Sequence, residues 1–292
     1  MQRIRKAVFP VAGLGTRFLP ASKAMPKEML TIVDRPLIQM VVDEAREAGI
    51  EHFVFVTGRG KSVIEDHFDH QPELEDTLSA RGKTAELDGL AADLPAAGRT
   101  SFTRQQAPLG LGHAVWCARD IVGDEPFALI LPDVLVRNTP GCTRQMVDAW
   151  HALGGGNLTA VEEVPPERVS SYGVVGVGRE HGRAFELDGM VEKPKPDEAP
   201  SNLIITGRYI LEPEIFALLE EQEAGAGGEI QVTDAMLRLA EKRPFYGYRF
   251  EGETFDCGSK LGFLAANVAY GLDRDDLGDA FREEIARLMG RG

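Results

Sequence analysis

The stretch VFPVAGLGTRFLPASKAMPK, residues 8–27, is the part of the chain from which the rest is best interpreted. An apolar strand is expected at Ala7–Val11, and it runs directly into Gly13 and Gly15. Cations separated by prolines follow the glycines: Arg17, Pro20, Lys23, Pro26 and Lys27. Glycine lets backbone N–H groups approach an anion and the cations would neutralise it, so the loop is a candidate polyphosphate cradle. A structural turn with incidental cations fits the spacing equally well.

The distribution of charge sets this stretch apart from the rest of the 292-residue chain. The first 27 residues hold six Lys and Arg and no Asp or Glu, whereas the net charge of the whole chain is −14, so the remaining residues together carry −20. This acidic balance argues against nucleic acid as a partner, because such binding depends on clustered Lys and Arg. An anionic ligand must therefore be met by local cations.

Neither a targeting segment nor a membrane span is expected. The apolar run after Lys6 is interrupted at Pro10 and is too short for a signal sequence or a transmembrane helix. The cysteines are odd in number, widely spaced and outside any CxxC pair: Cys117, Cys142 and Cys257. Such cysteines are typical of free thiols in a reducing compartment, so we expect a cytoplasmic protein with no membrane partner.

Strands and helices alternate in the first part of the chain. Strands are expected at Ala7–Val11, His52–Thr57, Ser101–Gln105 and Phe127–Leu131. Helices are expected from a cap at Asp34 to Gly49, at Lys61–Phe68 and at Gly110–Asp120. The alternation predicts an α/β fold of Rossmann-like type, with a mixed, mainly parallel sheet and helices on both faces. Residues 71–99 break the pattern and are expected to form a surface excursion with some helix.

The character of the chain changes after residues 165 and 166, both proline, where strands follow one another with few helices between them. Further strands are expected at Asn157–Val164, Tyr172–Val177, Ala184–Glu192, Leu203–Leu211 and Phe245–Phe250. Further helices are expected at Cys142–Leu153, Glu212–Leu219, Glu229–Lys242 and Ser259–Tyr270, with a turn at Gly225–Gly228. We expect a single domain over 1–292, with halves at about 1–135 and 136–270, a smaller β-rich part within the second half, and a C-terminal helix at about 274–290.

Two common nucleotide-binding motifs are ruled out. The loop begins like a dinucleotide fingerprint, but Phe18 stands where the third glycine is required. Pro20 and Pro26 also prevent a helix from opening at the loop, so no helix N-terminus can receive a pyrophosphate. Residues 60–62, Gly-Lys-Ser, end like a P-loop, but Phe55 stands where that motif needs glycine.

Acidic residues that follow predicted strands are candidates for a metal site. Asp133 ends the run LILPD, and Asp256 follows the expected strand end at Phe255. A carboxylate just past a buried parallel strand lies where α/β sheets bind ligands, although either residue could simply cap a turn or a helix. Together with a basic loop they suit a nucleoside triphosphate with Mg²⁺, which prefers one or two carboxylates plus phosphate oxygens and water.

The tripeptide at residues 192–194, Glu-Lys-Pro, places a hydroxyl acceptor beside a cation. On a strand, Glu192 and Lys193 would point to opposite faces, so the bend at Pro194 must re-aim one of them if both are to contact one ligand. A plain surface turn is the alternative.

Several blocks occur in a fixed order along the chain: VAGLGTRFLPASKAMPKEML, QQAPLGLGHAV, LILPDVL, YGVVGV, MVEKPKP, GRYIL, GGEIQVTDAM and FDCGSKLGF. Together they resemble the bacterial UTP–glucose-1-phosphate uridylyltransferases, a family of nucleotidyltransferases with the nucleotide-diphospho-sugar transferase fold. The resemblance implies transfer of uridylyl from UTP to glucose 1-phosphate, which yields UDP-glucose for polysaccharide and envelope glycan synthesis and releases pyrophosphate. It also implies Mg²⁺ as cofactor and a homodimer or homotetramer.

The resemblance assigns roles to individual residues. The nucleotide side is matched by Ala12, Gly13, Gly15 and Thr16, with Gln106 and Gly112 reading uracil, Arg17 binding the departing pyrophosphate and Lys27 the α-phosphate. The sugar side, in the β-rich part, is matched by Gly173, by Glu192 toward glucose hydroxyls and by Lys193 toward the sugar phosphate. Asp133 and Asp256 match the magnesium-holding aspartates, and Val134 stands where some relatives carry a second carboxylate.

The chemistry so implied is a direct in-line attack of the sugar-phosphate oxygen on the α-phosphorus, with no covalent enzyme intermediate. Two alternatives stay open at this point. One is a related nucleotidyltransferase that uses dTTP or another hexose phosphate. The other is a non-catalytic homologue that binds a nucleotide sugar, which would be marked by loss of Arg17, Lys27 or Asp133, and all three are present.

Overall fold

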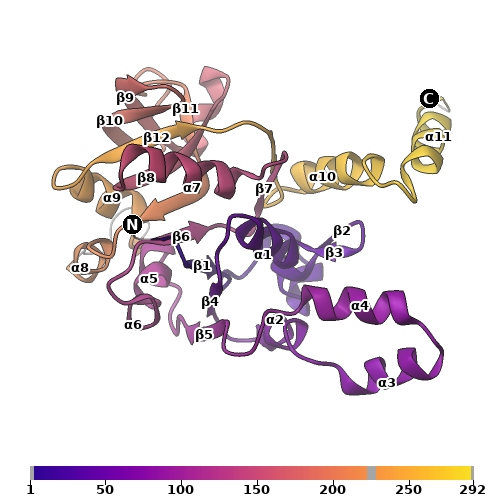
Figure 1. Cartoon of the computed structure of the whole chain (residues 1–292). Coiled ribbons are helices and arrows are strands. Elements are labelled where there is room, and N and C mark those ends of the chain that lie inside the picture. The colour runs from indigo at the N-terminus through magenta and orange to yellow at the C-terminus, as the bar shows by residue number, and fades with distance from the viewer. Residues whose placement is uncertain (1–2, 222–227, 291–292) are drawn as a thin grey trace.

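The computed structural model describes residues 3–221 and 228–290. Apart from Gly228, the turn expected at Gly225–Gly228 lies outside the described residues. A nine-stranded sheet in the order β5-β4-β1-β6-β11-β8-β12-β10-β9 runs through the molecule, with helices on both of its faces (Figure 1). The expected α/β class is therefore confirmed.

The N-terminal half of the sheet is parallel, as the alternation of strands and helices predicts. It consists of β1 (Lys6–Pro10), β4 (His52–Thr57), β5 (Thr100–Arg104) and β6 (Phe127–Ile130). All three neighbouring pairs among these strands are parallel. Because parallel strands run in one direction, their carboxyl ends, and the loops that follow them, lie along one edge of the sheet.

The other half of the sheet is more mixed than expected. It consists of β8 (Asn157–Glu163), β9 (Gly173–His181), β10 (Ala184–Glu192), β11 (Leu203–Leu211) and β12 (Phe245–Arg249). Only β8 and β12 pair in parallel, whereas β11 is antiparallel to β6 and β8, and β10 is antiparallel to β9 and β12. The short β9–β10 connection explains part of this, because a parallel pair would need a long crossover.

The helices pack as two apolar layers against the sheet. One layer includes α1 (Leu37–Glu47), α2 (Ser62–His67) and α7 (Cys142–Leu153), and the other includes α5 (Leu111–Trp116), α6 (Arg119–Val122), α8 (Ile215–Glu220) and α9 (Val232–Ala240). Along β1, Ala7 and Phe9 belong to the first layer and Val8 to the second, as side-chain alternation on a strand requires.

Short elements complete the fold. They are the 3₁₀ helices Thr16–Phe18, Ala21–Lys23, Lys27–Met29 and Pro166–Ser171, and the strand pairs β2 (Thr31–Ile32) with β3 (Arg35–Pro36) and β7 (Val134–Arg137) with β13 (Glu253–Asp256). The pairing of β7 with β13 places Asp256 opposite Val134, next to Asp133. Two chain segments far apart in sequence therefore meet at the candidate metal carboxylates.

Some local predictions are wrong. Asp34 does not cap α1: it forms an ion pair with Arg274, and Pro36 is the residue that precedes the helix. The helix expected over Gly110–Asp120 divides into α5 and α6, and the helix expected from Glu229 begins only at Val232. Helical propensity is a weak guide at such positions, because tertiary contacts such as the Asp34–Arg274 ion pair override it.

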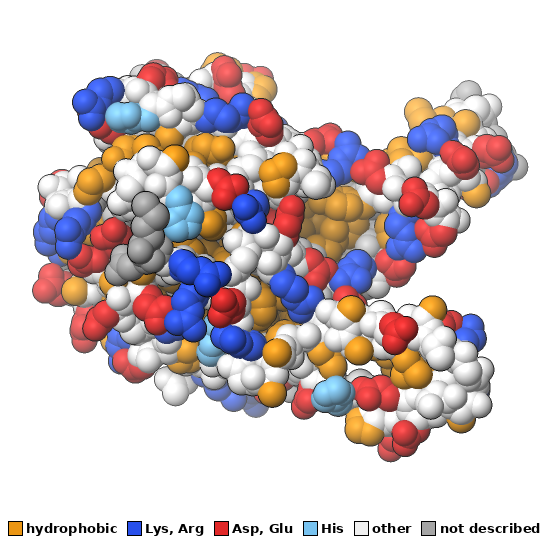
Figure 2. Space-filling model, viewed as in Figure 1, with side chains coloured by type: hydrophobic (Ala, Val, Ile, Leu, Met, Phe, Trp, Pro, Cys, Tyr) orange, Lys and Arg blue, Asp and Glu red, His pale blue; other side chains and the backbone are white. Residues whose placement is uncertain are grey.

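Two helical pairs project from the body (Figure 1). The excursion at 71–99 is a pair of exposed helices, α3 (Pro72–Ala80) and α4 (Thr84–Asp93), as expected. The C-terminal arm consists of α10 (Lys260–Leu272) and α11 (Gly278–Met289), and α11 packs on α10 rather than on the sheet. On the face seen in Figure 2, acidic and basic side chains are interspersed. Among the described residues, no helix is long and apolar enough to cross a membrane.

Candidate active site

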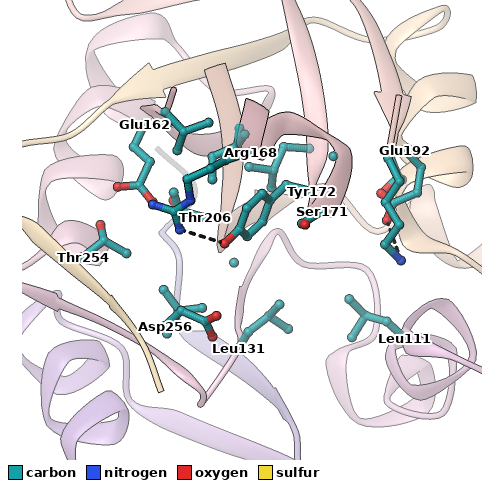
Figure 3. A pocket seen from close by; sticks show the side chains of 18 of the residues that line it. Leu111, Leu131, Glu162, Arg168, Ser171, Tyr172, Glu192, Thr206, Thr254 and Asp256 are labelled. Atoms are coloured by element: carbon teal, nitrogen blue, oxygen red, sulfur yellow. Dashed lines mark hydrogen bonds and ion pairs between the residues drawn. The ribbon is translucent and has the colours of Figure 1, made fainter. Parts of the chain in front are cut away.

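Two neighbouring cavities open at the carboxyl ends of the parallel strands. The first, here called the loop cavity, has a volume of about 430 Å³ and is lined by Gly13, Gly15 and Lys27 of the basic loop together with Asp133. The second, the strand cavity, has a volume of about 410 Å³ and lies against β8, β9 and β11 (Figure 3). Leu111 and Leu131 line both, so the two cavities adjoin.

The basic loop follows β1 as a series of single 3₁₀ turns, and no α-helix opens there. Gly15 adopts a left-handed conformation with φ of 66°, and its carbonyl accepts a hydrogen bond from the Ser22 hydroxyl at 2.7 Å. A side chain at Gly15 would also lie 3.2 Å from the Cβ atoms of Lys27 and Ser22. Glycine is therefore required for the loop to fold tightly enough to bring Lys27 into the cavity. Ala12 and Thr16 line the same cavity, as expected.

Lys27 and Asp133, which both line the loop cavity, form an ion pair with 2.5 Å between Nζ and Oδ2. Burial would lower the pKa of Lys27, but the Asp133 carboxylate and, after it, Glu28 outweigh burial and hold that pKa above its usual value. Burial would raise the pKa of Asp133, but Lys27 outweighs it and holds that pKa below its usual value. Both groups are therefore charged at neutral pH.

Asp133, Asp256 and Arg17 converge on Gly258. A Cβ atom placed on Gly258 would lie 2.9 Å from Asp256 Oδ1, 3.1 Å from Asp133 Oδ2 and 3.4 Å from an Arg17 guanidinium nitrogen. The backbone N–H of Gly258 also donates to Asp256 Oδ1 at 3.0 Å. The absence of a side chain at this position therefore leaves a small cradle between two carboxylates. Asp256 does not cap the following helix, because Ser259 does so through Gly262 N–H.

The cradle fits a hard divalent cation whose remaining ligands come from the substrate and from water. In the described part of the chain, no group of three or more His, Cys, Asp and Glu side chains could hold a metal ion. Asp133 and Asp256 offer two carboxylates at one point, and Mg²⁺ is commonly held by one or two carboxylates together with phosphate oxygens and water. These two residues would hold such an ion, and bound there it would supply positive charge to phosphate oxygens.

Glu192 and Lys193 both line the strand cavity, although one ends β10 and the other follows it. The cause is the backbone of Lys193, which is left-handed with φ of 49°. This conformation costs a non-glycine residue about 1–3 kcal/mol and turns Lys193 back toward its neighbour. Its Nζ lies 3.4 Å from Glu192 Oε1 (Figure 3), and Glu192 Oε2 accepts from the Thr233 hydroxyl at 2.9 Å. The side chain of Lys193 is therefore redirected by the backbone of Lys193 itself and not by a bend at Pro194.

Gly173 opposes this pair across the β9–β10 ladder, where it is in register with Glu192. A Cβ atom there would lie 3.1 Å from Glu192 Oε2, so glycine leaves room for the carboxylate. The cavity also contains polar residues to which the sequence assigned no role: Glu162, Arg168 and Tyr172 (Figure 3). Arg168 donates to the Tyr172 hydroxyl at 3.2 Å. Tyr172 opens the block YGVVGV, whereas Glu162 and Arg168 belong to none of the blocks.

The two residues expected to read the base lie differently from expectation. Gln106 is exposed, and the described residues that line the loop cavity include its neighbour Gln105 instead. Gln105 Nε2 donates to the Gly110 carbonyl at 2.9 Å, which leaves Oε1 as an acceptor. Gly112 is buried, and its N–H donates to the Ile230 carbonyl at 2.8 Å, while Gly110 lines the cavity. Gln105 and Gln106 are adjacent in the sequence. The motif alone therefore does not show which of the two faces the cavity.

A basic glycine loop, paired carboxylates and two adjoining cavities are the features of an enzyme that joins a nucleotide to a second substrate. The family model for nucleotidyl transferases matches residues 6–271. The chain therefore belongs to the nucleotidyl transferase family.

Individual relatives are more specific. The chain is 52% identical over 258 residues to UTP–glucose-1-phosphate uridylyltransferase of Komagataeibacter xylinus, which covers 88% of this chain and 90% of the relative. It is 49% identical to the enzyme of that name from Bacillus subtilis, over 100% of this chain and 99% of the relative. The solved UDP-glucose pyrophosphorylase of Acinetobacter baumannii matches with a TM-score of 0.89 and 45% identity, over 98% and 99% of the two chains. These matches confirm the resemblance inferred from the sequence blocks.

Replacement of Gly258 by alanine should weaken binding of divalent cations. The added methyl group would occupy the cradle between Asp133 and Asp256, and disturbance of residues around a metal site typically costs about 10–100-fold in affinity or activity. We expect the Mg²⁺ concentration for half-maximal activity to rise by about 10-fold or more.

The matched control is Gly89→Ala in α4, where a Cβ atom meets nothing within 4 Å. That variant should keep the parent metal dependence. An unchanged Mg²⁺ titration in Gly258→Ala would mean that the ion lies elsewhere.

Proposed function

We propose that this chain transfers the uridylyl group of UTP to α-D-glucose 1-phosphate and produces UDP-glucose and pyrophosphate. The observation that carries the proposal is the convergence of Arg17, Asp133 and Asp256 on Gly258, between a loop cavity and a strand cavity. A site of this form can hold two anionic substrates with their phosphates facing one another. Relatives of nearly full-length coverage bear the name UTP–glucose-1-phosphate uridylyltransferase, and similar structures are described as UTP-bound and as complexed with UDP-glucose.

The main physical problem of this reaction is repulsion between a triphosphate and a sugar phosphate. At an effective dielectric constant of about 20, each pair of like charges at ~4 Å costs roughly 4 kcal/mol. We assign Lys27 to the α-phosphate, Arg17 to the departing pyrophosphate and Lys193 to the sugar phosphate. Once the repulsion is offset and the reactants are aligned, the sugar-phosphate oxygen attacks the α-phosphorus in line, and no protein nucleophile is needed.

The Lys27–Asp133 ion pair suits an exchange of partners on substrate binding. Before substrate enters, each group neutralises the other. A triphosphate would draw the Lys27 ammonium, and the carboxylates of Asp133 and Asp256 would then be free to hold Mg²⁺. Charge in the cavity stays balanced throughout, so neither group has to be left buried and unpaired.

We assign the loop cavity to the nucleotide and the strand cavity to the sugar phosphate. The lining of the loop cavity comes from residues 10–133 with the addition of Glu229, and most of the lining of the strand cavity comes from residues 162–256. This supports the division into halves at about residue 135 within one domain. Glu192 is suited to glucose hydroxyls, which need an acceptor, and Gly173 leaves space beside it.

The setting of the enzyme belongs to the same proposal. We place it in the cytoplasm, where UTP and glucose 1-phosphate are available, and where free thiols such as Cys117, Cys142 and Cys257 persist. Its product would supply polysaccharide and envelope glycan synthesis.

A pyrophosphate-release assay tests the function. UTP and then dTTP are each supplied with glucose 1-phosphate and Mg²⁺. We expect release with UTP and slower release with dTTP. Faster release with dTTP would identify a thymidylyltransferase, and release with neither nucleotide would indicate a non-catalytic binding protein.

Lys27→Ala should lower turnover by about 10²–10³, the loss typical for one charge-stabilising donor at a reacting centre. The measurement is kcat for pyrophosphate release. Lys23→Ala is the matched control, because Lys23 lies in the same loop and is exposed. A near-normal rate for Lys27→Ala would show that another cation faces the α-phosphate.

Gln105 rather than Gln106 should read the uracil base. Gln105→Ala is expected to raise the KM for UTP by about 10-fold, which corresponds to the loss of about one hydrogen bond, while Gln106→Ala stays within twofold of the parent. Steady-state kinetics with varied UTP distinguish the two. An effect confined to Gln106→Ala would restore the expectation from the sequence.

The C-terminal arm suits a homodimer or homotetramer. Leu261, Leu264 and Val268 lie on one face of α10 and are 79%, 61% and 40% exposed, and Leu288 and Met289 of α11 are exposed as well. Covering this apolar face with a second copy would remove it from water. Sedimentation equilibrium should find an oligomer that Leu261→Glu/Leu264→Glu dissociates. A monomeric parent protein would contradict the assignment.

A further inference from the structure

Arg208 of β11 is a fully buried cation that the proposed reaction does not use. Its side chain is 1% exposed. It forms a two-pronged ion pair with Glu44 of α1, in which Nε donates to Oε1 at 3.0 Å and Nη2 donates to Oε2 at 2.8 Å. Glu44 in turn accepts from both the hydroxyl and the backbone N–H of Thr143, at the start of α7. The pair therefore ties α1 and α7 to the centre of the sheet.

The remaining donors of Arg208 contact backbone carbonyls. Nη1 donates to the carbonyls of Leu131 at 3.1 Å and Gly207 at 3.3 Å, and Nη2 donates to that of Val134 at 2.7 Å. All five N–H groups of the guanidinium are thus used. A buried cation with every donor satisfied is rigid, because a shift in any direction breaks a hydrogen bond in a medium of low dielectric constant.

The carbonyls that Arg208 holds belong to one turn. Leu131 and Val134 flank Pro132 and Asp133, and the turn is closed by a bond of 3.4 Å from Val134 N–H to the Leu131 carbonyl. Arg208 therefore fixes the turn two residues before and one residue after the carboxylate of Asp133. The same turn leads into β7, which pairs with the strand that carries Asp256.

We propose that Arg208, held by Glu44, is a positioning residue that fixes the Asp133 carboxylate for divalent-cation binding. The inference rests on the proposed function for the role of Asp133. Arginine is required because only a planar fork can bind a carboxylate with one edge and two separate carbonyls with the other. Lysine would keep the charge beside Glu44 but could not span both ends of the turn.

Binding of Mn²⁺ in the presence of UTP, followed through the electron paramagnetic resonance signal of free Mn²⁺ and corrected for the Mn²⁺ that the same UTP binds without protein, tests this without turnover. Arg208→Lys is expected to weaken Mn²⁺ binding by about 10-fold, within the range for residues that orient metal ligands. The KM for glucose 1-phosphate, set across the site by Glu192 and Lys193, should stay within twofold. In an Asp133→Asn background, Arg208→Lys should cause no additional loss of Mn²⁺ affinity, because the two changes act on one group.

Gln145→Met is the matched control, since buried Gln145 also clamps two carbonyls, those of Pro140 and Glu251, away from Asp133. It should lower thermal stability and leave Mn²⁺ affinity unchanged. If Arg208→Lys does not fold, Glu44→Gln, which keeps the size of the side chain, takes its place. Unchanged Mn²⁺ affinity in the folded variant, or equal losses in Gln145→Met, would overturn the proposal. Failure of the uridylyl-transfer assay alone would leave this result intact, so the two tests are separable.

Discussion

The site depends on one close meeting of opposite charges around a residue that has no side chain. These charges come from three separate segments: the basic loop with Arg17 and Lys27, the turn with Asp133, and the end of β13 with Asp256. Gly258 leaves the space in which Arg17, Asp133 and Asp256 meet, and Lys27 pairs with Asp133. At this spacing like charges repel, and unlike charges in a partly buried site attract strongly. Moving one of these side chains alone would therefore leave its partner buried and unpaired. The loop of single 3₁₀ turns, the β7–β13 pair and the strand ends all act to hold these groups in place.

The sheet explains how the two cavities come to lie side by side. The parallel strands β4, β1 and β6 end at one edge of the sheet, where β1 leads into the basic loop and β6 leads to Asp133. Strand β11 pairs antiparallel with β6 and so brings the second half of the sheet to the same edge. The two cavities therefore adjoin along one continuous nine-stranded sheet. Arg208 lies on β11 at this junction, and its contacts with the Leu131–Val134 turn join the two halves where the charges meet.

Much of this could be predicted from the sequence, because the relevant signals are local. The alternation of buried strands and helices predicts the α/β class, and the glycines and cations of residues 8–27 predict an anion site. The meeting of Asp133 with Asp256 could be inferred only by family resemblance, because it results from the pairing of β7 with β13, whose paired residues lie 116 to 122 positions apart in the sequence. Nor does the sequence separate Gln105 from Gln106, since a one-residue shift along a loop changes which side chain faces the cavity.

Other features lie beyond sequence reasoning for physical reasons. The left-handed backbone of Lys193 is imposed by its surroundings against local preference, so no propensity could reveal it. Arg208 has the sequence appearance of an ordinary strand residue, and only the fold shows that all its donors are satisfied inside the protein. Asp34 has the residue type and position of a helix cap, but in the folded chain it pairs with Arg274, which is distant in sequence.

In the proposed reaction, the gathered charges bring two phosphates together for a single direct displacement. Exchange of labelled pyrophosphate into UTP measures this most directly, first without and then with glucose 1-phosphate. A direct displacement predicts no exchange until the sugar phosphate is present. Exchange in its absence would require a uridylylated enzyme and would contradict the account.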